Sequence, residues 1–306
     1  MLYRGYDVES DICVVNSRGK PAAVKRVLVR GIRDFDPVHI FECGQCFRWS
    51  KEPDGSYTGV VRGKVANVSY APGMLVINNA TMEDFKDTWF DYFDLGRDYG
   101  MIKKAVITDE IMEKAVEFGS GIRLLRQEPW EVLVSFIISA NNRISRIKRN
   151  IHDISRLFGE EKEYGGKKYY CFPDAEKLAS LSLEQVMECR AGYRCEYIID
   201  TARAAAAGEF DPEKLGKLDA DEARKALKHF KGVGDKVADC ILLYSGTRYD
   251  VFPVDVWVKR VMQELYFGRD VGLNEIRMFA RDRFGRYAGF AQQYLFYYAR
   301  EHKIGA

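Results

Sequence analysis

The sequence lacks the features that would place the chain in or across a membrane. Its longest apolar stretch runs only from Val132 to Ala140, whereas a helix needs roughly 20 apolar residues to span a bilayer. No secretory h-region opens the chain, because Met1–Ser10 already carries Arg4, Asp7 and Glu9. We therefore expect an intracellular protein that has no membrane partner.

A large excess of one charge is also missing. The chain has 47 Lys and Arg residues against 45 Asp and Glu residues, which leaves a net charge of +2. Overall charge therefore does not indicate a polyanionic partner, and any basic surface must be local.

Cysteine and histidine are too few and too scattered for a cross-linked or metal-centred protein. Seven cysteines, an odd number at irregular spacing, argue against a disulfide framework. Cys43 and Cys46 form a single Cys-x-x-Cys pair, and the chain has only four histidines, whereas a structural zinc site needs four ligands. No cysteine follows Cys240, which excludes a C-terminal iron–sulfur cluster of four cysteines. We expect no required cofactor, no zinc and no iron–sulfur cluster.

The chain changes its character near residue 80. Before this point, short β-forming segments separated by turn residues predict strands over 46–49, 56–61, 65–70 and 74–78. Thr81 is predicted to be the N-cap of a first helix. Later helices are predicted over 131–140, 144–157, 193–207, 222–228, 234–245, 254–265, 274–284 and 288–303.

This order of elements predicts an α+β fold. A small N-terminal antiparallel β-sheet domain with flanking helices is expected over residues 1–117. A mainly α-helical domain is expected over residues 118–306. The charged, glycine-rich segment 159–168 is predicted to be a loop.

A short segment of the helical part has the pattern of a helix-hairpin-helix motif, at about 222–245. One helix ends near His229, a turn contains Gly232 and Gly234, and a second helix begins near Asp235. Two glycines allow positive φ and a close approach of the backbone, and the start of a helix offers free N–H groups to a phosphate. An ordinary corner between two helices, with glycine as C-cap, is the alternative at this point.

Lys236 and Asp255 form a candidate catalytic pair. Asp255 follows Pro253 in the first turn of the next predicted helix, so one helix and one loop could bring it back to Lys236. A neutral lysine amine can attack a sugar C1′ and form a Schiff base. A carboxylate beside the sugar stabilises the positive charge that develops as the base leaves. The alternative is a structural salt bridge at a helix junction.

The segment Gly232-Val-Gly-Asp-Lys236 followed by Pro253-Val-Asp255 resembles the helix-hairpin-helix Gly/Pro…Asp DNA glycosylase superfamily. More narrowly, residues 27–296 are similar to the 8-oxoguanine DNA glycosylase/AP lyases of the eukaryotic type. The resemblance implies a TATA-binding-protein-like sheet domain before two helical subdomains, with Lys236 as nucleophile and Asp255 as catalytic carboxylate. It also implies that a monovalent or calcium ion binds the main-chain carbonyls of Lys228, Phe230 and Val233.

Recognition of the damaged base is implied by three further segments. Gly44-Gln-Cys-Phe-Arg-Trp49 resembles the family segment whose first carbonyl accepts a hydrogen bond from N7–H of 8-oxoguanine. Guanine N7 is a bare acceptor, so a fixed carbonyl attracts the lesion and repels guanine, although Gly44 could instead serve only a β-turn. Gln292 and Phe296 share one helix face and match the residues that bind the Watson–Crick edge and stack on the ring. Cys240 matches the residue that covers the other face and pairs electrostatically with the lysine.

The base opposite the lesion is expected to meet a separate set of side chains. Asn141 and Arg146 match the family residues that contact the orphaned cytosine, and Arg194 matches a second arginine with that role. Paired arginine donors suit the O2 and N3 acceptors of cytosine. Tyr193 matches the aromatic wedge that fills the gap left by a flipped base. Taken singly, Tyr193 could be a core residue and Arg146 a solvated charge.

Three positions depart from the family pattern. Trp257 stands where the animal enzymes carry histidine, Ala299 where they carry aspartate, and Arg143 in place of a third asparagine. We expect Trp257 to pack the wall of the lesion-binding pocket differently, which puts the fine substrate range in doubt.

The resemblance implies a base-excision repair enzyme that removes 8-oxoguanine, preferably opposite cytosine, and cleaves the strand by β-elimination through a Lys236 Schiff base. Its partner would be double-stranded DNA containing 8-oxoguanine opposite cytosine, bound by a monomer inside the cell. One alternative is a glycosylase of the same fold that removes other damaged bases. Such enzymes use water in place of an attacking lysine, so the presence of Lys236 disfavours this alternative. The other is a non-catalytic helix-hairpin-helix DNA-binding protein, which Lys236, Asp255 and Tyr193 together disfavour.

Overall fold

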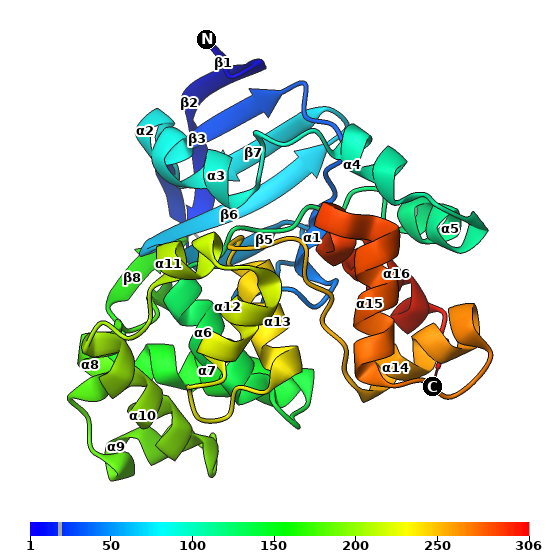
Figure 1. Cartoon of the computed structure of the whole chain (residues 1–306). Helices are drawn as coiled ribbons and strands as arrows, with labels where there is room; N and C mark the ends of the chain where they lie inside the picture. Colours follow the sequence, from blue (N-terminus) through cyan, green and yellow to red (C-terminus); the bar gives the residue numbers. More distant parts are fainter. Residues whose placement is uncertain (18–19, 306) are drawn as a thin grey trace.

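The computed structural model describes residues 1–17 and 20–305, in which an antiparallel sheet lies above two groups of helices (Figure 1). The strands follow the spatial order β1-β2-β3-β7-β6-β5-β4. The predicted α+β order, with a sheet first and helices after it, is confirmed. The strands are β1 (Leu2–Tyr3), β2 (Tyr6–Ser17), β3 (Lys20–Arg30), β4 (Trp49–Lys51), β5 (Tyr57–Val61), β6 (Lys64–Ala71) and β7 (Met74–Asn78).

The prediction for the sheet is right for β5, β6 and β7 and wrong at two other places. The strand expected over 46–49 begins only at Trp49, as β4. The first hairpin, β2 with β3, was not predicted before Val27. β3 pairs with β7 only over Arg26–Arg30, so the rest of the hairpin projects from the sheet, and Ile12 and Val14 are exposed. Without a buried face, its residues lack the alternation that marks a strand.

The loop predicted over 159–168 is also wrong, because this segment is a β-hairpin. β8 (Glu161–Tyr164) pairs with β9 (Lys167–Tyr170) across Gly165 and Gly166, which both have positive φ. A Gly-Gly pair between two strands is typical of tight hairpin turns. The strands carry alternating charges rather than apolar residues, so their pattern resembles that of a solvated loop.

The helices next to the sheet bury aromatic side chains against it. α1 (Pro37–Phe41) brings Phe41 onto Trp49, with ring centroids 4.2 Å apart. Thr81 caps the next helix as predicted, in a capping box with Asp84. This helix continues as α2 (Met82–Asp84), the π-helical turn η1 (Phe85–Trp89) and α3 (Phe90–Tyr92). It covers the sheet with Trp89 and Phe93, which are fully buried.

The remaining helices form two groups with α6 and α13 between them (Figure 1). One core joins α6 to α7–α10, and the other joins α4, α5, α6 and α12–α16. The helices are α4 (Tyr99–Val106), α5 (Glu110–Phe118), α6 (Pro129–Ser139), α7 (Ile144–Phe158), α8 (Ala175–Ala179), α9 (Leu183–Met187), α10 (Arg194–Ala206), α11 (Pro212–Lys217), α12 (Ala220–Leu227), α13 (Asp235–Tyr244), α14 (Val256–Met262), η2 (Gln263–Phe267), α15 (Leu273–Phe284), η3 (Gly285–Tyr287) and α16 (Ala288–Glu301).

One hydrophobic core extends across the domain boundary expected near residue 118. α4 and α5 precede this boundary in the chain, but they share a core with α16. Tyr99, Ile102 and Met112 contribute the buried side chains on this side. The first helices after the sheet therefore pack with the last helix of the chain.

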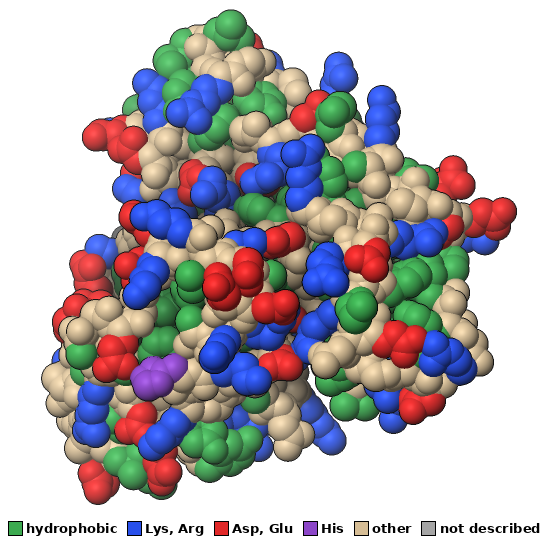
Figure 2. Space-filling model, viewed as in Figure 1, with side chains coloured by type: hydrophobic (Ala, Val, Ile, Leu, Met, Phe, Trp, Pro, Cys, Tyr) green, Lys and Arg blue, Asp and Glu red, His purple; other side chains and the backbone are tan. Residues whose placement is uncertain are grey.

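The surface agrees with the small net charge. Figure 2 shows Lys and Arg side chains interspersed with Asp and Glu over the face that it displays. Within the part of the chain that the structure describes, no helix combines the length and the apolar character needed to cross a membrane.

Candidate functional site

The turn between α12 and α13 has the geometry of a helix-hairpin-helix motif. Gly232 has φ of +83°, and a Cβ there would lie 2.7 Å from the Tyr197 ring, so only glycine fits. Gly234 differs from the expectation, because its φ is −94°. It is the N-cap of α13, and a Cβ there would meet nothing within 4 Å. Its missing side chain therefore leaves open space before the N–H groups of α13, where a phosphate could approach.

Ion pairs hold the two helices of the hairpin to each other and to α15. Lys228 Nζ lies 2.7 Å from Asp235 Oδ1 across the turn. Asp239 of α13 is fully buried, and its carboxylate contacts Arg224 of α12 at 2.8 Å and Arg277 of α15 at 3.5 Å. Burial raises the pKa of Asp239 to about 6 although both arginines oppose the rise. These contacts join α12, α13 and α15.

Lys236 lies in the first turn of α13, above a stack of two aromatic rings. Its Nζ is 5.5 Å from the centroid of the Phe136 ring, and Phe136 stacks on Tyr244 with centroids 5.3 Å apart. Cys240 follows one turn later and is 3% exposed. Burial raises the pKa of the Cys240 thiol to about 11, while the charge of Lys236 lowers it and that of Asp255 raises it. The charges of Lys236 and Asp255 thus both act on the Cys240 thiol.

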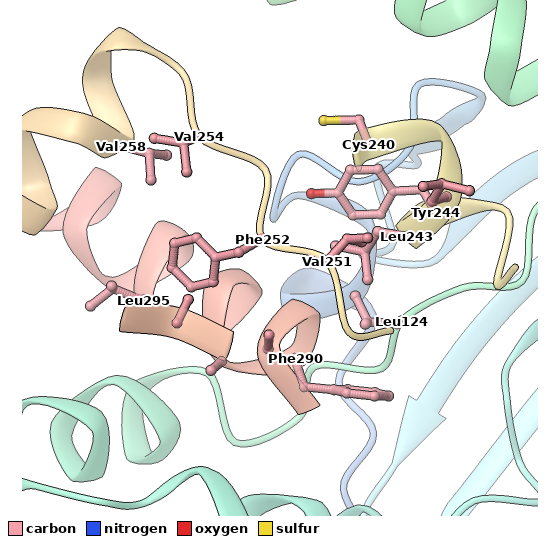
Figure 3. Packing of buried hydrophobic residues seen from close by; sticks show 14 of the residues in the cluster. Leu124, Cys240, Leu243, Tyr244, Val251, Phe252, Val254, Val258, Phe290 and Leu295 are labelled. Atoms are coloured by element: carbon pink, nitrogen blue, oxygen red, sulfur yellow. The ribbon is translucent and has the colours of Figure 1, made fainter. Parts of the chain in front are cut away.

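Asp255 precedes its helix instead of lying in the first turn, because the helix begins at Val256, two residues later than expected. It is the N-cap of α14, and its Oδ1 accepts a hydrogen bond of 2.7 Å from the Val258 N–H. The preceding residues Val251, Phe252 and Val254 are buried. In Figure 3, Val251 lies beside Leu243 of α13, Phe252 near Leu295 of α16, and Val254 beside Val258 of α14. This apolar anchor and the cap fix the position of the Asp255 carboxylate relative to α13.

Gly44 lies in a loop of the sheet domain that reaches the C-terminal helix. Its φ is +92°, and a Cβ there would lie 3.3 Å from the Phe296 ring. The next residue, Gln45, is fully buried. Its Nε2 donates to the carbonyls of Ile40 and Arg123 at 2.9 and 2.8 Å, and its Oε1 accepts from the Leu125 N–H at 2.9 Å. Gln45 therefore locks the backbone around Gly44.

A second hydrogen-bond chain connects this loop to both helical elements of the site. Gln293 of α16 donates from Nε2 to the Cys43 carbonyl at 3.0 Å and accepts from the Tyr244 hydroxyl at 2.9 Å. Sequence reasoning missed Gln45 and Gln293. A signal was present, because each is a polar residue within an apolar segment and adjoins a predicted site residue.

Gln292, which precedes Gln293 on α16, is only 3% exposed. Among the described residues its Oε1 has no hydrogen-bond partner. A buried acceptor left in this state costs about 1–3 kcal/mol, which a ligand with N–H donors would recover. Phe296, one turn later, meets Trp257 edge-on with ring centroids 5.1 Å apart.

Two of the three departures from the family pattern, Trp257 and Ala299, lie on α14 and α16, and the third, Arg143, is the exposed N-cap of α7. Trp257 packs against Phe296. Ala299 is fully buried on the same helix.

Cys43 and Cys46 are buried free thiols. Burial raises the pKa of Cys43 to about 11 and raises that of Cys46 further. Over residues 1–17 and 20–305 no group of three or more His, Cys, Asp or Glu side chains could hold a metal ion.

The residues expected to meet the opposite base lie around the turn between α6 and α7. Asn141 is exposed in this turn, with φ of +49°. Arg194 is only 5% exposed, and it donates from Nε to the Ala140 carbonyl at 3.1 Å and from Nη2 to the Asn141 carbonyl at 2.9 Å. Arg194 therefore supports the turn from inside. Arg146 is exposed on α7.

Tyr193 is 56% exposed at the N-terminus of α10, so its alternative role as a core residue is wrong. The Arg194 guanidinium lies 4.5 Å from its ring centroid. The rings of Tyr193 and Tyr197 meet edge to face with their centroids 5.6 Å apart, and Tyr197 lies against Gly232. The candidate wedge is thus supported by the hairpin.

Comparison with known proteins gives the same assignment over most of the chain. Residues 27–133 match the family described as 8-oxoguanine DNA glycosylase, N-terminal domain. Residues 134–281 match the HhH-GPD superfamily base excision DNA repair protein family. A probable N-glycosylase/DNA lyase of Methanothermobacter thermautotrophicus is 35% identical over 214 residues, which cover 63% of this chain and 68% of that protein.

Two solved structures are similar over nearly the whole chain. The 8-oxoguanine glycosylase/lyase of Clostridium acetobutylicum, in complex with double-stranded DNA containing cytosine opposite 8-oxoG, is 46% identical. The match has a TM-score of 0.88 and covers 98% of this chain and 99% of that one. MBOgg1 in complex with a low-affinity DNA ligand is 48% identical, with a TM-score of 0.88 and coverage of 96% and 99%. The protein therefore belongs to the 8-oxoguanine DNA glycosylase family of the HhH-GPD superfamily.

Proposed function

We propose that this protein excises 8-oxoguanine from duplex DNA and then cleaves the strand at the resulting abasic site. The observation that carries the proposal is that the charges of Lys236 and Asp255 both act on the buried Cys240 thiol. Lys236 lies in the first turn of α13, the second helix of a hairpin that leaves open space before this helix. Membership of the glycosylase family supports the same activity, and acting on DNA places the protein inside the cell.

The reaction uses two side chains at the sugar. The Lys236 amine bonds to C1′ as the bond from C1′ to the base breaks, and the base leaves with its electron pair. The Asp255 carboxylate stabilises the positive charge that develops on the sugar. Ring opening gives a Schiff base at Lys236, and loss of a proton from C2′ then expels the 3′ phosphate.

Lesion recognition rests on acceptors that guanine cannot satisfy equally. The Gly44 carbonyl would accept N7–H, which 8-oxoguanine has and guanine lacks. The partnerless Oε1 of Gln292 would accept an N–H of the Watson–Crick edge. Phe296 would stack on one face of the base, with Trp257 packed behind it, and Cys240 would cover the other.

A preference for cytosine opposite the lesion is the first test. Wild-type protein is expected to excise 8-oxoguanine faster opposite cytosine than opposite adenine. The expected ratio is roughly tenfold to a hundredfold, because one wrong base pair costs about 1–3 kcal/mol in typical sites. Excision rates opposite each of the four bases, with borohydride trapping of the Schiff base, measure this. Equal rates opposite cytosine and adenine would remove the support for cytosine recognition.

Variants of Arg146 and Arg194 are expected to give different results in this test. Arg146→Met is expected to flatten the preference more than it slows excision opposite cytosine. Arg194→Ala should flatten it too, but it should also lower the melting temperature, since Arg194 holds two backbone carbonyls. If Arg146→Met instead weakened binding to every duplex alike, Arg146 would only neutralise phosphate.

We further propose a structural cation at the hairpin and no other metal. The carbonyls of Lys228, Phe230 and Val233 belong to the turn after α12, and Phe230 already accepts a hydrogen bond from the Val233 N–H at 3.1 Å. Carbonyl oxygens are ligands suited to calcium and similar hard cations. When bound, such an ion would fix the turn.

Elemental analysis is expected to find neither zinc nor iron in stoichiometric amounts. The scattered, buried thiols cannot supply four ligands at one place. Either metal near one per chain would overturn this prediction, whereas calcium or potassium would not.

A further inference from the structure

The N-terminal half of α7 carries more positive charge than cytosine recognition uses. Arg143, Arg146, Lys148, Arg149 and His152 are all exposed, and we name them the α7 ridge. The buried face of the same helix is formed by Ile147, Asn150, Ile151 and Ile154. The ridge therefore makes up most of the outer face of this half of the helix, with Ile144 and Ser145 as its uncharged exposed residues.

The cations of the ridge are not neutralised by the protein. Ion pairs nearby join Arg48 to Glu131, Arg156 to Asp153 and Lys168 to Glu161. Among the described residues, no ion pair involves Arg143, Arg146, Lys148 or Arg149. The first turn of α7 contains no acidic residue, and its N-cap Arg143 makes no side-chain cap.

This arrangement is unfavourable for the isolated helix. Positive charges near a helix N-terminus oppose the helix dipole, and like charges spaced three or four residues apart repel each other. Arg143 with Arg146, and Arg146 with Arg149, have such spacings. Local rules are broken in this way where a function requires it.

Beyond Arg146 the ridge borders a cavity of about 400 Å³. Lys148, Arg149 and His152 line it from α7, and Lys168 and Tyr169 line it from β9. Among the described residues, its lining contains no acidic side chain. The lining therefore favours an anionic occupant, and several cationic groups in a row suit a chain of phosphates.

We propose that the α7 ridge binds the phosphate backbone of the undamaged strand beyond the orphaned base. Arg143, the N-cap of α7, lies at one end of the ridge, and Arg146 follows in the first turn of the helix, close to the turn that presents Asn141. From Arg146 to His152 the helix rises about 9 Å, which spans two to three nucleotides at roughly 3.4 Å each along one strand. The choice of DNA as the polyanion rests on the proposed function.

The test is the salt dependence of binding to an undamaged duplex between 50 and 200 mM KCl, followed by fluorescence anisotropy. Lys148→Gln/Arg149→Gln should reduce the slope of log K against log salt by about 1.8, since each phosphate contact contributes about 0.9. Over this range the wild type should lose about twelvefold more affinity than the variant. Lys148→Gln alone should give about half the change in slope. The ratio of excision opposite cytosine and adenine should not change.

The matched control is Lys104→Gln/Lys114→Gln, which removes the same charge from exposed positions on α4 and α5. These helices lie away from α7 in Figure 1. A ridge variant with the slope of the wild type, or with no more change than the control, would overturn the proposal. If the wild type failed to excise 8-oxoguanine, the proposed function would fall, while the slopes on undamaged DNA would still decide the ridge.

Discussion

Lys236→Gln is expected to abolish both base release and borohydride trapping while lesion-containing duplex still binds. The amine supplies the covalent step, whereas the phosphate grip comes from the backbone around Gly232 and Gly234. Glutamine is one atom shorter than lysine but keeps an unbranched polar side chain over the Phe136 ring, so the packing of α13 should survive. Single-turnover excision, trapping and duplex affinity are the three measurements.

A matched control for this variant is Lys225→Gln, on the exposed face of α12. It removes one positive charge near the same hairpin without touching the site, so trapping and excision should persist. Full excision activity in Lys236→Gln would show that another group, or water, attacks the sugar. A parallel loss of DNA affinity would instead point to a role of Lys236 in binding phosphate.

Asp255→Asn should slow excision by roughly 10²–10³-fold, the range seen when one group that stabilises transition-state charge is removed. Duplex affinity and the free energy of unfolding should change little. The reason is specific to this structure, because Asp255 caps α14 through the Val258 N–H and asparagine caps helices about equally well. Excision rates under single-turnover conditions and thermal unfolding measure the two effects separately.

Asp255→Ala separates the two tasks of this carboxylate. It should slow excision as much as Asp255→Asn does and should also destabilise the fold by about 1 kcal/mol, since the cap is lost. Should Asp255→Asn retain most of the excision rate while Asp255→Ala loses it together with stability, the carboxylate acts only as a helix cap.

The residue types of the site could be predicted from the sequence because they belong to short motifs. Lys236 follows the hairpin glycines directly, Asp255 follows Pro253, and Gln292 and Phe296 share a helix face. Such spacings are local, and a helix or a tight turn converts them into position with little help from the rest of the chain. The turn signals around β6 and β7 are equally local, and these strands lie where the pattern places them.

The distances between motifs were decided by the tertiary structure alone. Gly44 approaches Phe296 only because Gln45 and Gln293 hydrogen-bond to backbone from distant elements, and no local period encodes such contacts. The Arg194 side chain is buried because its guanidinium donates hydrogen bonds to the carbonyls of a turn that precedes it by more than fifty residues. The β2–β3 arm and the β8–β9 hairpin were missed for the converse reason. Their strands are held mainly by pairing with each other, so they carry little of the hydrophobic alternation that burial imposes on a sequence.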